Sequence, residues 1–191
     1  MDIEREKREE LISVLEGNFV CFEECRLKLA GFDQYLRTDV LAVPRYGNDR
    51  WIFAFEVKVP TVKWEFKTWI RALRQAADYP NCHVADERAG TANGSLVNAT
   101  FLYPGLDLRG WDDEASLENR FYREHDREPL RGAFLFAQHF RVGSVAIKPR
   151  NGQVSLKLGT DPVWDSRSDF RSKAPGLLAK RPVGSSKRST T

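Results

Sequence analysis

Three charged side chains inside two apolar segments are the residues best suited to chemistry in this sequence. Asp39 lies within RTDVLAV, and Glu56 and Lys58 lie within WIFAFEVKV, residues 51–59. Side chains alternate along a strand, so Glu56 and Lys58 point to one face of an extended segment. If the segment carrying Asp39 is its antiparallel neighbour, all three groups meet at one edge of a sheet. Two carboxylates about 4 Å apart repel by roughly 4 kcal/mol at an effective dielectric of about 20.

A divalent cation would turn that repulsion into binding. Asp39, Glu56 and the backbone carbonyl of Val57 form an all-oxygen ligand set of the kind that Mg²⁺ or Mn²⁺ prefers. Such an ion lowers the pKa of a bound water and neutralises charge on a phosphodiester. Lys58 would then position the attacking water or stabilise the pentavalent phosphorus. The alternative is a structural ion pair between Glu56 and Lys58, because a lone charge in so apolar a strand is costly.

The segments around these residues predict the elements that position them. Residues 2–16 have an apolar stripe at helical spacing, and Gly17-Asn18 ends the helix. A second helix follows Pro60. The expected helices are 2–16 and 63–79, and the expected strands on this side are 19–29, 35–43 and 51–59. The strand at 51–59 is nearly continuously apolar, which is typical of a strand buried on both faces.

The second half of the sequence predicts more strands and a charged end. We expect a loop over 86–95, a strand at 96–103, a helix at 113–124 and two or three strands within 132–158, where Asn151-Gly152 is a hairpin signal. The fold class is therefore α/β, a central mixed sheet flanked by helices, with an additional C-terminal β-rich portion. Residues 1–165 are expected to form one domain, and residues 166–191 a disordered basic tail.

One face of the second helix carries polar residues four apart. Lys67, Arg71, Gln75 and Tyr79 follow one another at i, i+4 spacing. A basic stripe that ends in an amide and a phenol is suited to contact a nucleic-acid backbone. The alternative is an ordinary solvated helical face.

Charge and cysteine content limit the other classes of function. Six of the 30 Lys and Arg residues, and no acid, follow Phe170, so the rest of the chain has 24 basic and 27 acidic residues and is not a basic clamp. No apolar run reaches the roughly 20 residues that span a bilayer, and the charged N-terminus favours a cytoplasmic or nucleoid-associated protein without a membrane partner. A zinc site would combine Cys21, Cys25, Cys82 and His83, but in a strand the first two thiols lie roughly 13 Å apart.

The order of these motifs resembles the PD-(D/E)xK nuclease superfamily, in the branch with a QxxxY motif (the RecB-like exonucleases). The resemblance covers residues 6–105 and rests on Asp39, Glu56-Val57-Lys58 and the Gln75–Tyr79 segment QAADY. It implies a restriction-endonuclease-like core and Mg²⁺- or Mn²⁺-dependent hydrolysis of DNA. Asp39 and Glu56 would be metal ligands and Lys58 the catalytic lysine, while Gln75 and Tyr79 would support the site or touch the substrate backbone.

The sequence departs from the family pattern in two places. Thr38, and not a proline, precedes Asp39. Many members carry a glutamate on the first helix, for which Glu6, Glu9 and Glu10 are candidates here. Glu10 lies beside the buried stripe and is the expected additional metal ligand. The sequence thus predicts a metal-dependent deoxyribonuclease acting in repair, recombination, restriction or phage DNA processing. A non-catalytic nucleic-acid-binding or protein-interaction module with the same fold is the alternative, and a homo-oligomer or protein partner is left open.

Overall fold

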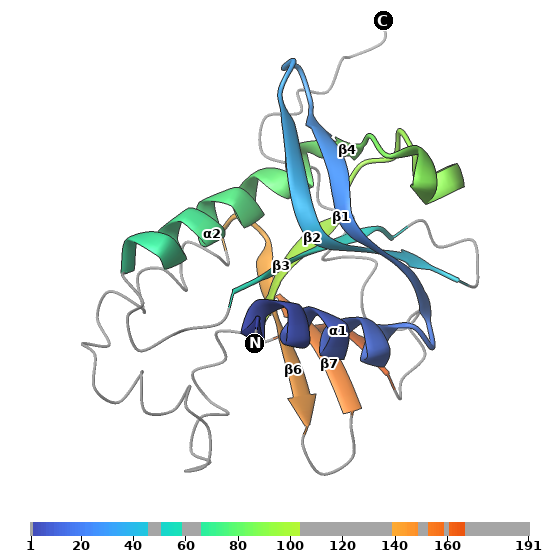
Figure 1. The fold of residues 1–191 in the computed structure, drawn as a ribbon, viewed down its shortest axis with the longest axis vertical. Coiled ribbons are helices and arrows are strands. Elements are labelled where there is room, and N and C mark those ends of the chain that lie inside the picture. The colour runs from blue at the N-terminus through green and yellow to red at the C-terminus, as the bar shows by residue number, and fades with distance from the viewer. Residues whose placement is uncertain are drawn as a thin grey trace, which may run out of the picture.

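The chain folds as a mixed α/β structure built on one eight-stranded sheet (Figure 1). The computed structural model describes residues 2–45, 51–58, 66–103, 139–148, 153–158 and 161–166. In chain order the elements are α1 (Ile3–Leu15), β1 (Phe19–Leu29), β2 (Tyr35–Pro44), β3 (Phe53–Val57), α2 (Phe66–Asp78), the 3₁₀ turn η1 (Tyr79–Asn81), β4 (Cys82–Val84), the 3₁₀ segment η2 (Glu87–Ala92), β5 (Ala99–Tyr103), β6 (Val142–Lys148), β7 (Gln153–Leu158) and β8 (Asp161–Asp165).

The strands lie in the order β4-β1-β2-β3-β5-β6-β7-β8. β3 pairs antiparallel with β2 and parallel with β5, and β5 pairs parallel with β6. The remaining pairs are antiparallel. A parallel pair needs a long crossover connection, and between β3 and β5 that connection contains α2. The sheet is therefore mixed, as expected, and β3 lies near its middle.

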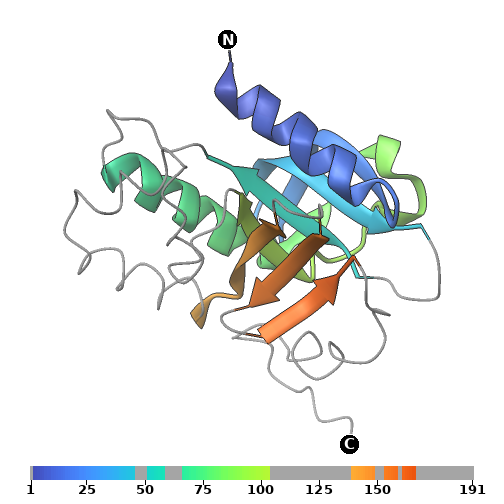
Figure 2. The ribbon, with the colours of Figure 1, turned by 90° about the horizontal axis from the view of Figure 1, so that it is seen from below.

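Side chains of β3 alternate between two cores. Phe53, Phe55 and Val57 pack in a first core with residues of α1. Ile52 and Ala54 pack in a second core with Tyr79, which directly follows α2. This alternation explains why the segment reads as continuously apolar. The two views show α1 crossing over the strands and α2 projecting beside them (Figures 1 and 2).

Most elements predicted around the candidate residues are confirmed. The helix expected at 2–16 and the strands expected at 19–29 and 35–43 appear as α1, β1 and β2. The expected strand 51–59 is shorter, and the expected helix 63–79 ends in a 3₁₀ turn that Pro80 initiates. β6 and β7 are the strands expected within 132–158. The predicted helix 113–124, and the predicted tail 166–191 apart from Ser166, lie outside the described residues.

Three elements were not predicted. The expected loop 86–95 contains η2, and two short strands, β4 and β8, extend the two ends of the sheet. β4 has three residues, which is too short for an alternating apolar pattern to be recognised, and it is held by pairing with β1. In the part of the chain that the structure describes, no helix has the length and apolar character needed to cross a membrane.

Gly143 of β6 should be intolerant of larger residues. It lies opposite Phe101 in the parallel β5–β6 pair, and a Cβ atom at this position would meet the Lys157 carbonyl oxygen and come within 2.6 Å of the Phe101 ring. We expect Gly143→Val to lower the free energy of unfolding by about 2 kcal/mol or more, because overpacking forces the backbone or the ring to move. Urea denaturation measures this. Gly17→Ala is the control, since nothing lies within 4 Å of that Cβ position, and equal stability of the two variants would contradict the expectation.

Candidate functional site

The structure brings Asp39, in the middle of β2, together with Glu56 and Lys58 at the end of the adjacent strand β3. Val40 of β2 pairs with Phe55 of β3, so the next positions along the two strands, Asp39 and Glu56, also lie opposite each other. Lys58 follows the last residue of β3. Charge interactions link all three: Asp39 raises the pKa of Glu56, and Lys58 lowers it. The structure therefore places these three side chains close enough for their charges to interact.

Glu56 is the most buried charged residue of this cluster, at 3% exposure. Its Oε2 atom accepts a hydrogen bond of 2.6 Å from the Tyr79 hydroxyl, and the Gln75 amide lies at 3.5 Å. Gln75 also donates to the Tyr79 oxygen over 2.6 Å. The spacing of four residues places both side chains on the same side of α2 and its 3₁₀ extension, so Gln75 and Tyr79 act as one support for Glu56.

The backbone carbonyl of Arg37 completes this support from β2. It accepts from the Tyr79 hydroxyl over 2.8 Å and from the Gln75 amide over 3.2 Å. The group is satisfied in either protonation state of Glu56. When Glu56 is ionised, Tyr79 donates a hydrogen bond to it and Gln75 donates one to the Arg37 carbonyl. When Glu56 is protonated, it can donate to the Tyr79 oxygen, and Tyr79 then donates to Arg37.

Burial makes the charged form of Glu56 unfavourable. Loss of hydration is the largest effect and the nearby Asp39 adds to it, so the pKa of Glu56 rises to about 8 although Tyr79 and Lys58 oppose the rise. Burial likewise raises the pKa of the Tyr79 phenol, with the Glu56 carboxylate as the next cause. At neutral pH this site therefore tends to hold a proton on Glu56.

Asp39 is half-buried and is held by the neighbouring strand. Its Oδ2 atom accepts a hydrogen bond of 2.6 Å from the backbone amide of Val57. Burial raises the pKa of Asp39, while this hydrogen bond and the Lys58 charge act against the rise. Val57 was expected to contribute its carbonyl to a metal ion; the structure shows its amide fixing the position of Asp39.

Lys58 is paired across to the first helix. Its ammonium group lies 3.2 Å from Oε2 of Glu4 in α1. Burial disfavours the charge on Lys58, but the carboxylates of Glu4, Glu56 and Asp39 together raise its pKa. The alternative of a direct Glu56–Lys58 ion pair is therefore not what the structure forms: Glu56 is bound by Tyr79, and Lys58 is bound by Glu4.

The glutamate of the first helix that reaches the site is Glu4, and the expectation of Glu10 is wrong. Glu10 is exposed and forms an ion pair of 2.9 Å with Lys7. It lies six residues further along α1, about 9 Å at the helical rise of 1.5 Å per residue. Glu4, by contrast, contributes to the pKa shifts of both Glu56 and Lys58.

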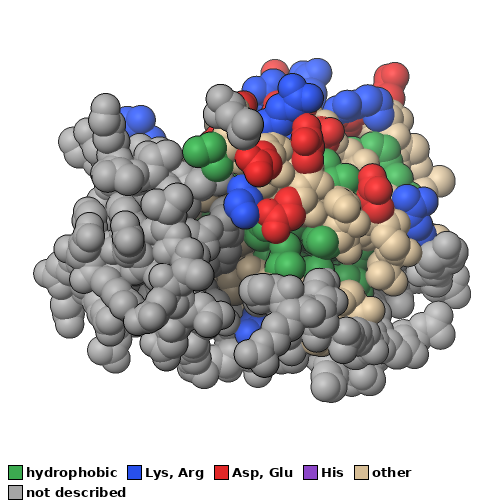
Figure 3. Space-filling view, turned by 60° about the horizontal axis from the view of Figure 1, so that its bottom comes forward, with side chains coloured by type: hydrophobic (Ala, Val, Ile, Leu, Met, Phe, Trp, Pro, Cys, Tyr) green, Lys and Arg blue, Asp and Glu red, His purple; other side chains and the backbone are tan. Residues whose placement is uncertain are grey.

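The residues of the predicted nucleic-acid-binding stripe on α2 differ in exposure. Arg71 is exposed, but Tyr79 is fully buried and Gln75 is turned toward Glu56. A direct contact of Tyr79 with nucleic acid is therefore a wrong prediction, since its hydroxyl is used inside the protein. The Lys67 side chain lies outside the described part of the chain. On the face drawn in Figure 3, acidic and basic side chains of the described residues lie next to one another.

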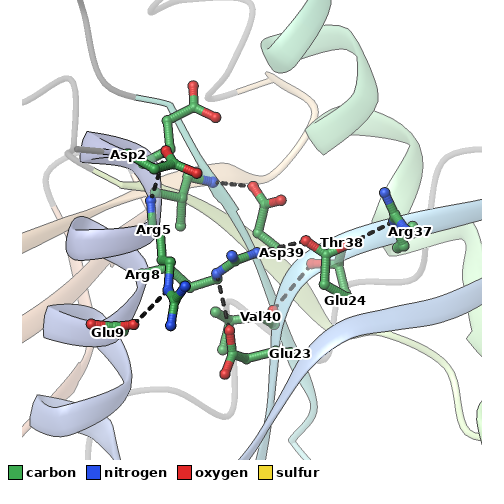
Figure 4. A network of polar contacts seen from close by, with 12 residues as sticks. Asp2, Arg5, Arg8, Glu9, Glu23, Glu24, Arg37, Thr38, Asp39 and Val40 are labelled. Atoms are coloured by element: carbon green, nitrogen blue, oxygen red, sulfur yellow. Dashed lines mark hydrogen bonds and ion pairs between the residues drawn. The ribbon is translucent and has the colours of Figure 1, made fainter.

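Sequence reasoning missed a second polar network beside the site (Figure 4). Arg8 of α1 is mostly buried, with a side chain 19% exposed, and forms ion pairs with Glu23 at 3.0 Å and Glu24 at 2.6 Å. Glu24 also binds Arg37 at 2.7 Å. Glu24 has a left-handed backbone with φ of +52°, which is uncommon for a non-glycine residue. The available signal was that Glu4 and Arg8 are at i−7 and i−3 from the buried Leu11 and so lie within the apolar stripe of α1.

The alternative zinc site is not assembled. Cys25 and Cys82 lie in the second core, whereas Cys21 packs against the first. All three thiols are free. Among the residues that the structure describes, no group of three or more His, Cys, Asp or Glu side chains is arranged to hold a metal ion.

Comparison with known proteins adds no assignment. No protein-family model, no curated protein and no solved structure matches this chain. The resemblance to the PD-(D/E)xK superfamily therefore stays a prediction that rests on the motif residues and on where the fold places them.

Glu56 should make the metal-free protein less stable at higher pH. Its folded pKa of about 8 lies above its ordinary value of 4.5, so between these limits the unfolded chain has lost the proton that the folded chain keeps, and stability falls as pH rises through this window. In chelator we expect Glu56→Gln to remove this slope and to be more stable than wild type at pH 8 by on the order of 2 kcal/mol. Urea denaturation at pH 6 and pH 8 measures both effects.

The control for this measurement is Glu10→Gln, which changes an exposed carboxylate on α1. It should retain the pH dependence of wild type. If Glu56→Gln kept the same slope as wild type between pH 6 and pH 8, Glu56 would be ionised throughout and the account of its burial would be wrong.

Proposed function

We propose that this chain is a metal-dependent nuclease that hydrolyses phosphodiester bonds in DNA, with a restriction-endonuclease-like core of the PD-(D/E)xK type. The observation that carries the proposal is the convergence of Asp39, in the middle of β2, with Glu56 and Lys58 at the end of β3. Gln75 and Tyr79 support this convergence from the next helix. All five positions belong to the motif set from which the resemblance was inferred.

The ligand chemistry fits a hard cation that is only partly held by protein. Mg²⁺ and Mn²⁺ favour oxygen ligands, and Mg²⁺ commonly binds through one or two carboxylates plus water and substrate phosphates. Burial, and after it the charge of Asp39, raises the pKa of Glu56, and a cation bound by the two carboxylates would relieve their mutual repulsion. When bound, the ion would supply an acidified water and neutralise charge on the scissile phosphate.

The protein side chains then have separate roles. Val57 holds Asp39 through its amide, and Tyr79 with Gln75 holds Glu56, so both carboxylates are fixed before substrate binds. Such preorganisation is the main way that proteins stabilise charge in a transition state. Lys58 carries its charge at the edge of the same cluster and can orient the attacking water or stabilise the negative charge on the oxygens of the pentavalent phosphoryl group. Glu4 sets the position of the Lys58 ammonium group.

One observation favours the alternative of a non-catalytic module. Each charged group of the cluster already has a partner within the protein: Val57 for Asp39, Tyr79 for Glu56 and Glu4 for Lys58. Such a network could serve stability alone. In that case the protein would bind nucleic acid or another protein without a metal, and Glu56→Gln would leave binding unchanged.

Cleavage assays distinguish the metal-dependent nuclease from the non-catalytic module. Linear, nicked and branched DNA are incubated with the protein in Mg²⁺, in Mn²⁺ and in chelator. We expect metal-dependent cleavage that falls at least about 100-fold in Asp39→Asn, Glu56→Gln and Lys58→Gln, a loss typical of removing one group that stabilises the transition state. Glu9→Gln, which changes an exposed carboxylate of α1, is the control. No cleavage by wild type with either metal, or equal cleavage by all variants, would contradict the proposal.

The two candidate glutamates of α1 should differ in the same assay. Because Glu4 contacts Lys58 and Glu10 contacts only Lys7 among the described ion pairs, Glu4→Gln should reduce cleavage and shift its pH dependence, whereas Glu10→Gln should not. Isothermal titration with Mn²⁺ gives a second measurement that does not require turnover. A larger effect of Glu10→Gln than of Glu4→Gln would show that α1 is placed differently in the active protein.

A further inference from the structure

The hairpin formed by β1 and β2 has one buried face and one charged face. Cys25 and Leu27 are fully buried in the second core, and Leu29 and Leu36 pack against that core. The cross-strand pairs on the other face are Arg26 with Arg37 and Lys28 with Tyr35. This face therefore presents three cationic side chains and an aromatic ring, although the rest of the chain before Phe170 has more acids than bases.

This arrangement contributes little to stability. Arg26 and Arg37 lie directly opposite each other, and like charges in that position destabilise a sheet. Two local contacts offset the repulsion: the Arg26 guanidinium lies 3.7 Å from the centre of the Tyr35 ring, and Arg37 binds Glu24. Lys28 binds Asp33 at 3.4 Å. Exposed ion pairs of this kind contribute about 0–1 kcal/mol, so a phosphate group can compete for these cations.

The turn at the end of the hairpin presents an apolar ring to solvent. Phe32 is 64% exposed, the largest value among the described large hydrophobic side chains, and Tyr35 is 42% exposed. The turn is fixed: the Ala30 amide donates to the Asn81 carbonyl over 2.9 Å, and Leu29 donates to Gln34 over 3.0 Å. In Figure 1 this turn lies at the end of the hairpin furthest from α1. Phe32 is thus held in place at a position where it packs against little of the described protein.

The charged face leads to the candidate site. Arg37 is two residues before Asp39 on β2, about 7 Å along an extended strand, and its carbonyl holds Tyr79 and Gln75. Exposed aromatic rings beside spaced cations are the features that bind single-stranded nucleic acid, because bases stack on the rings and phosphates contact the cations. Duplex DNA keeps its bases stacked in the helix and would leave Phe32 unused.

From this placement we propose that the outer face of the β1–β2 hairpin binds single-stranded DNA, with Phe32 and Tyr35 stacking on unpaired bases and Arg26, Lys28 and Arg37 contacting phosphates. The inference rests on the proposed function for the choice of DNA as the nucleic acid. It adds that the substrate enters as a single strand or as a junction with a single-stranded arm. The hairpin then carries that strand toward Asp39 and Glu56.

Binding in chelator tests the hairpin apart from catalysis. The full chain is titrated against a labelled 20-nucleotide single-stranded DNA of mixed sequence, against its duplex and against single-stranded RNA of the same sequence, with anisotropy as the readout at several NaCl concentrations. We expect Phe32→Ala to weaken single-strand binding by roughly 5- to 100-fold, the range for loss of one base–aromatic stack, and Phe32→Tyr to retain affinity. Arg26→Gln and Lys28→Gln should each reduce the slope of log Kd against log [NaCl] by about 0.7.

Matched controls lie elsewhere on the protein. Phe140→Ala removes another exposed aromatic ring, and Arg5→Gln removes a cation that, like Arg37, is largely exposed and paired with one glutamate. Both should bind single-stranded DNA as wild type does. A change in thermal stability is not expected for Phe32→Ala, so a loss of binding with an unchanged melting temperature supports the proposal.

Several outcomes would overturn the proposal. One is that Phe32→Ala binds the single-stranded DNA with the same affinity as wild type. Others are tighter binding to the duplex or to RNA, and conversion by Phe32→Ala of a dimer to a monomer in size-exclusion chromatography, which would make the turn a self-association surface. If Phe32→Ala bound single-stranded DNA as wild type does while wild type cut DNA with metal, this inference would be refuted and the proposed nuclease would remain. If single-stranded DNA bound to the hairpin as expected but no DNA was cut with either metal, the proposed nuclease activity would be refuted and the proposed binding surface would remain.

Discussion

The buried carboxyl group of Glu56 is the constraint on which the centre of this structure depends. A carboxyl group with 3% exposure is costly unless it is hydrogen-bonded. Its main partner, the Tyr79 hydroxyl, is also bound to the Arg37 carbonyl, so one side chain connects β3, β2 and the end of α2. The helix that links β3 to its parallel neighbour β5 must therefore dock at a defined register for the group to be satisfied. A shift of α2 by one residue would separate the two buried polar side chains of this group, Glu56 and Tyr79, from each other.

The polar contacts around Glu56 extend to the first helix by two routes. Lys58 binds Glu4 near the start of α1, and Arg8, one turn later, binds Glu24 on β1. Glu24 in turn binds Arg37, whose carbonyl supports Tyr79. The cluster is thus enclosed by a ring of contacts that passes through both helices and three strands. Asp39 and Glu56 keep their mutual position because every element around them is tied to another.

The sequence was a good guide where one pattern dominates and a poor one where packing decides. The apolar run at 51–59 predicted β3 and the segment 35–43 predicted β2, and the short connection between them predicted the antiparallel pairing that brings Asp39 opposite Glu56. β4 could not be predicted, because three residues carry no period. The choice of Glu4 over Glu10 depends on how α1 crosses the sheet, which a helical pattern alone does not define. The i, i+4 stripe left open whether Tyr79 supports the site or touches nucleic acid, because such a stripe can point inward as well as outward; the structure turns Tyr79 toward the buried Glu56.

The three free thiols have a practical consequence for following motions of the two cores. Burial raises the pKa of Cys21, Cys25 and Cys82 to about 12 in each case, so the reactive thiolate is scarce while the protein is folded. Cys25 and Cys82 report on the core beneath Tyr79, and Cys21 reports on the core beneath α1. Alkylation rates at these positions would therefore report the rate of local opening of each core separately, without an added label.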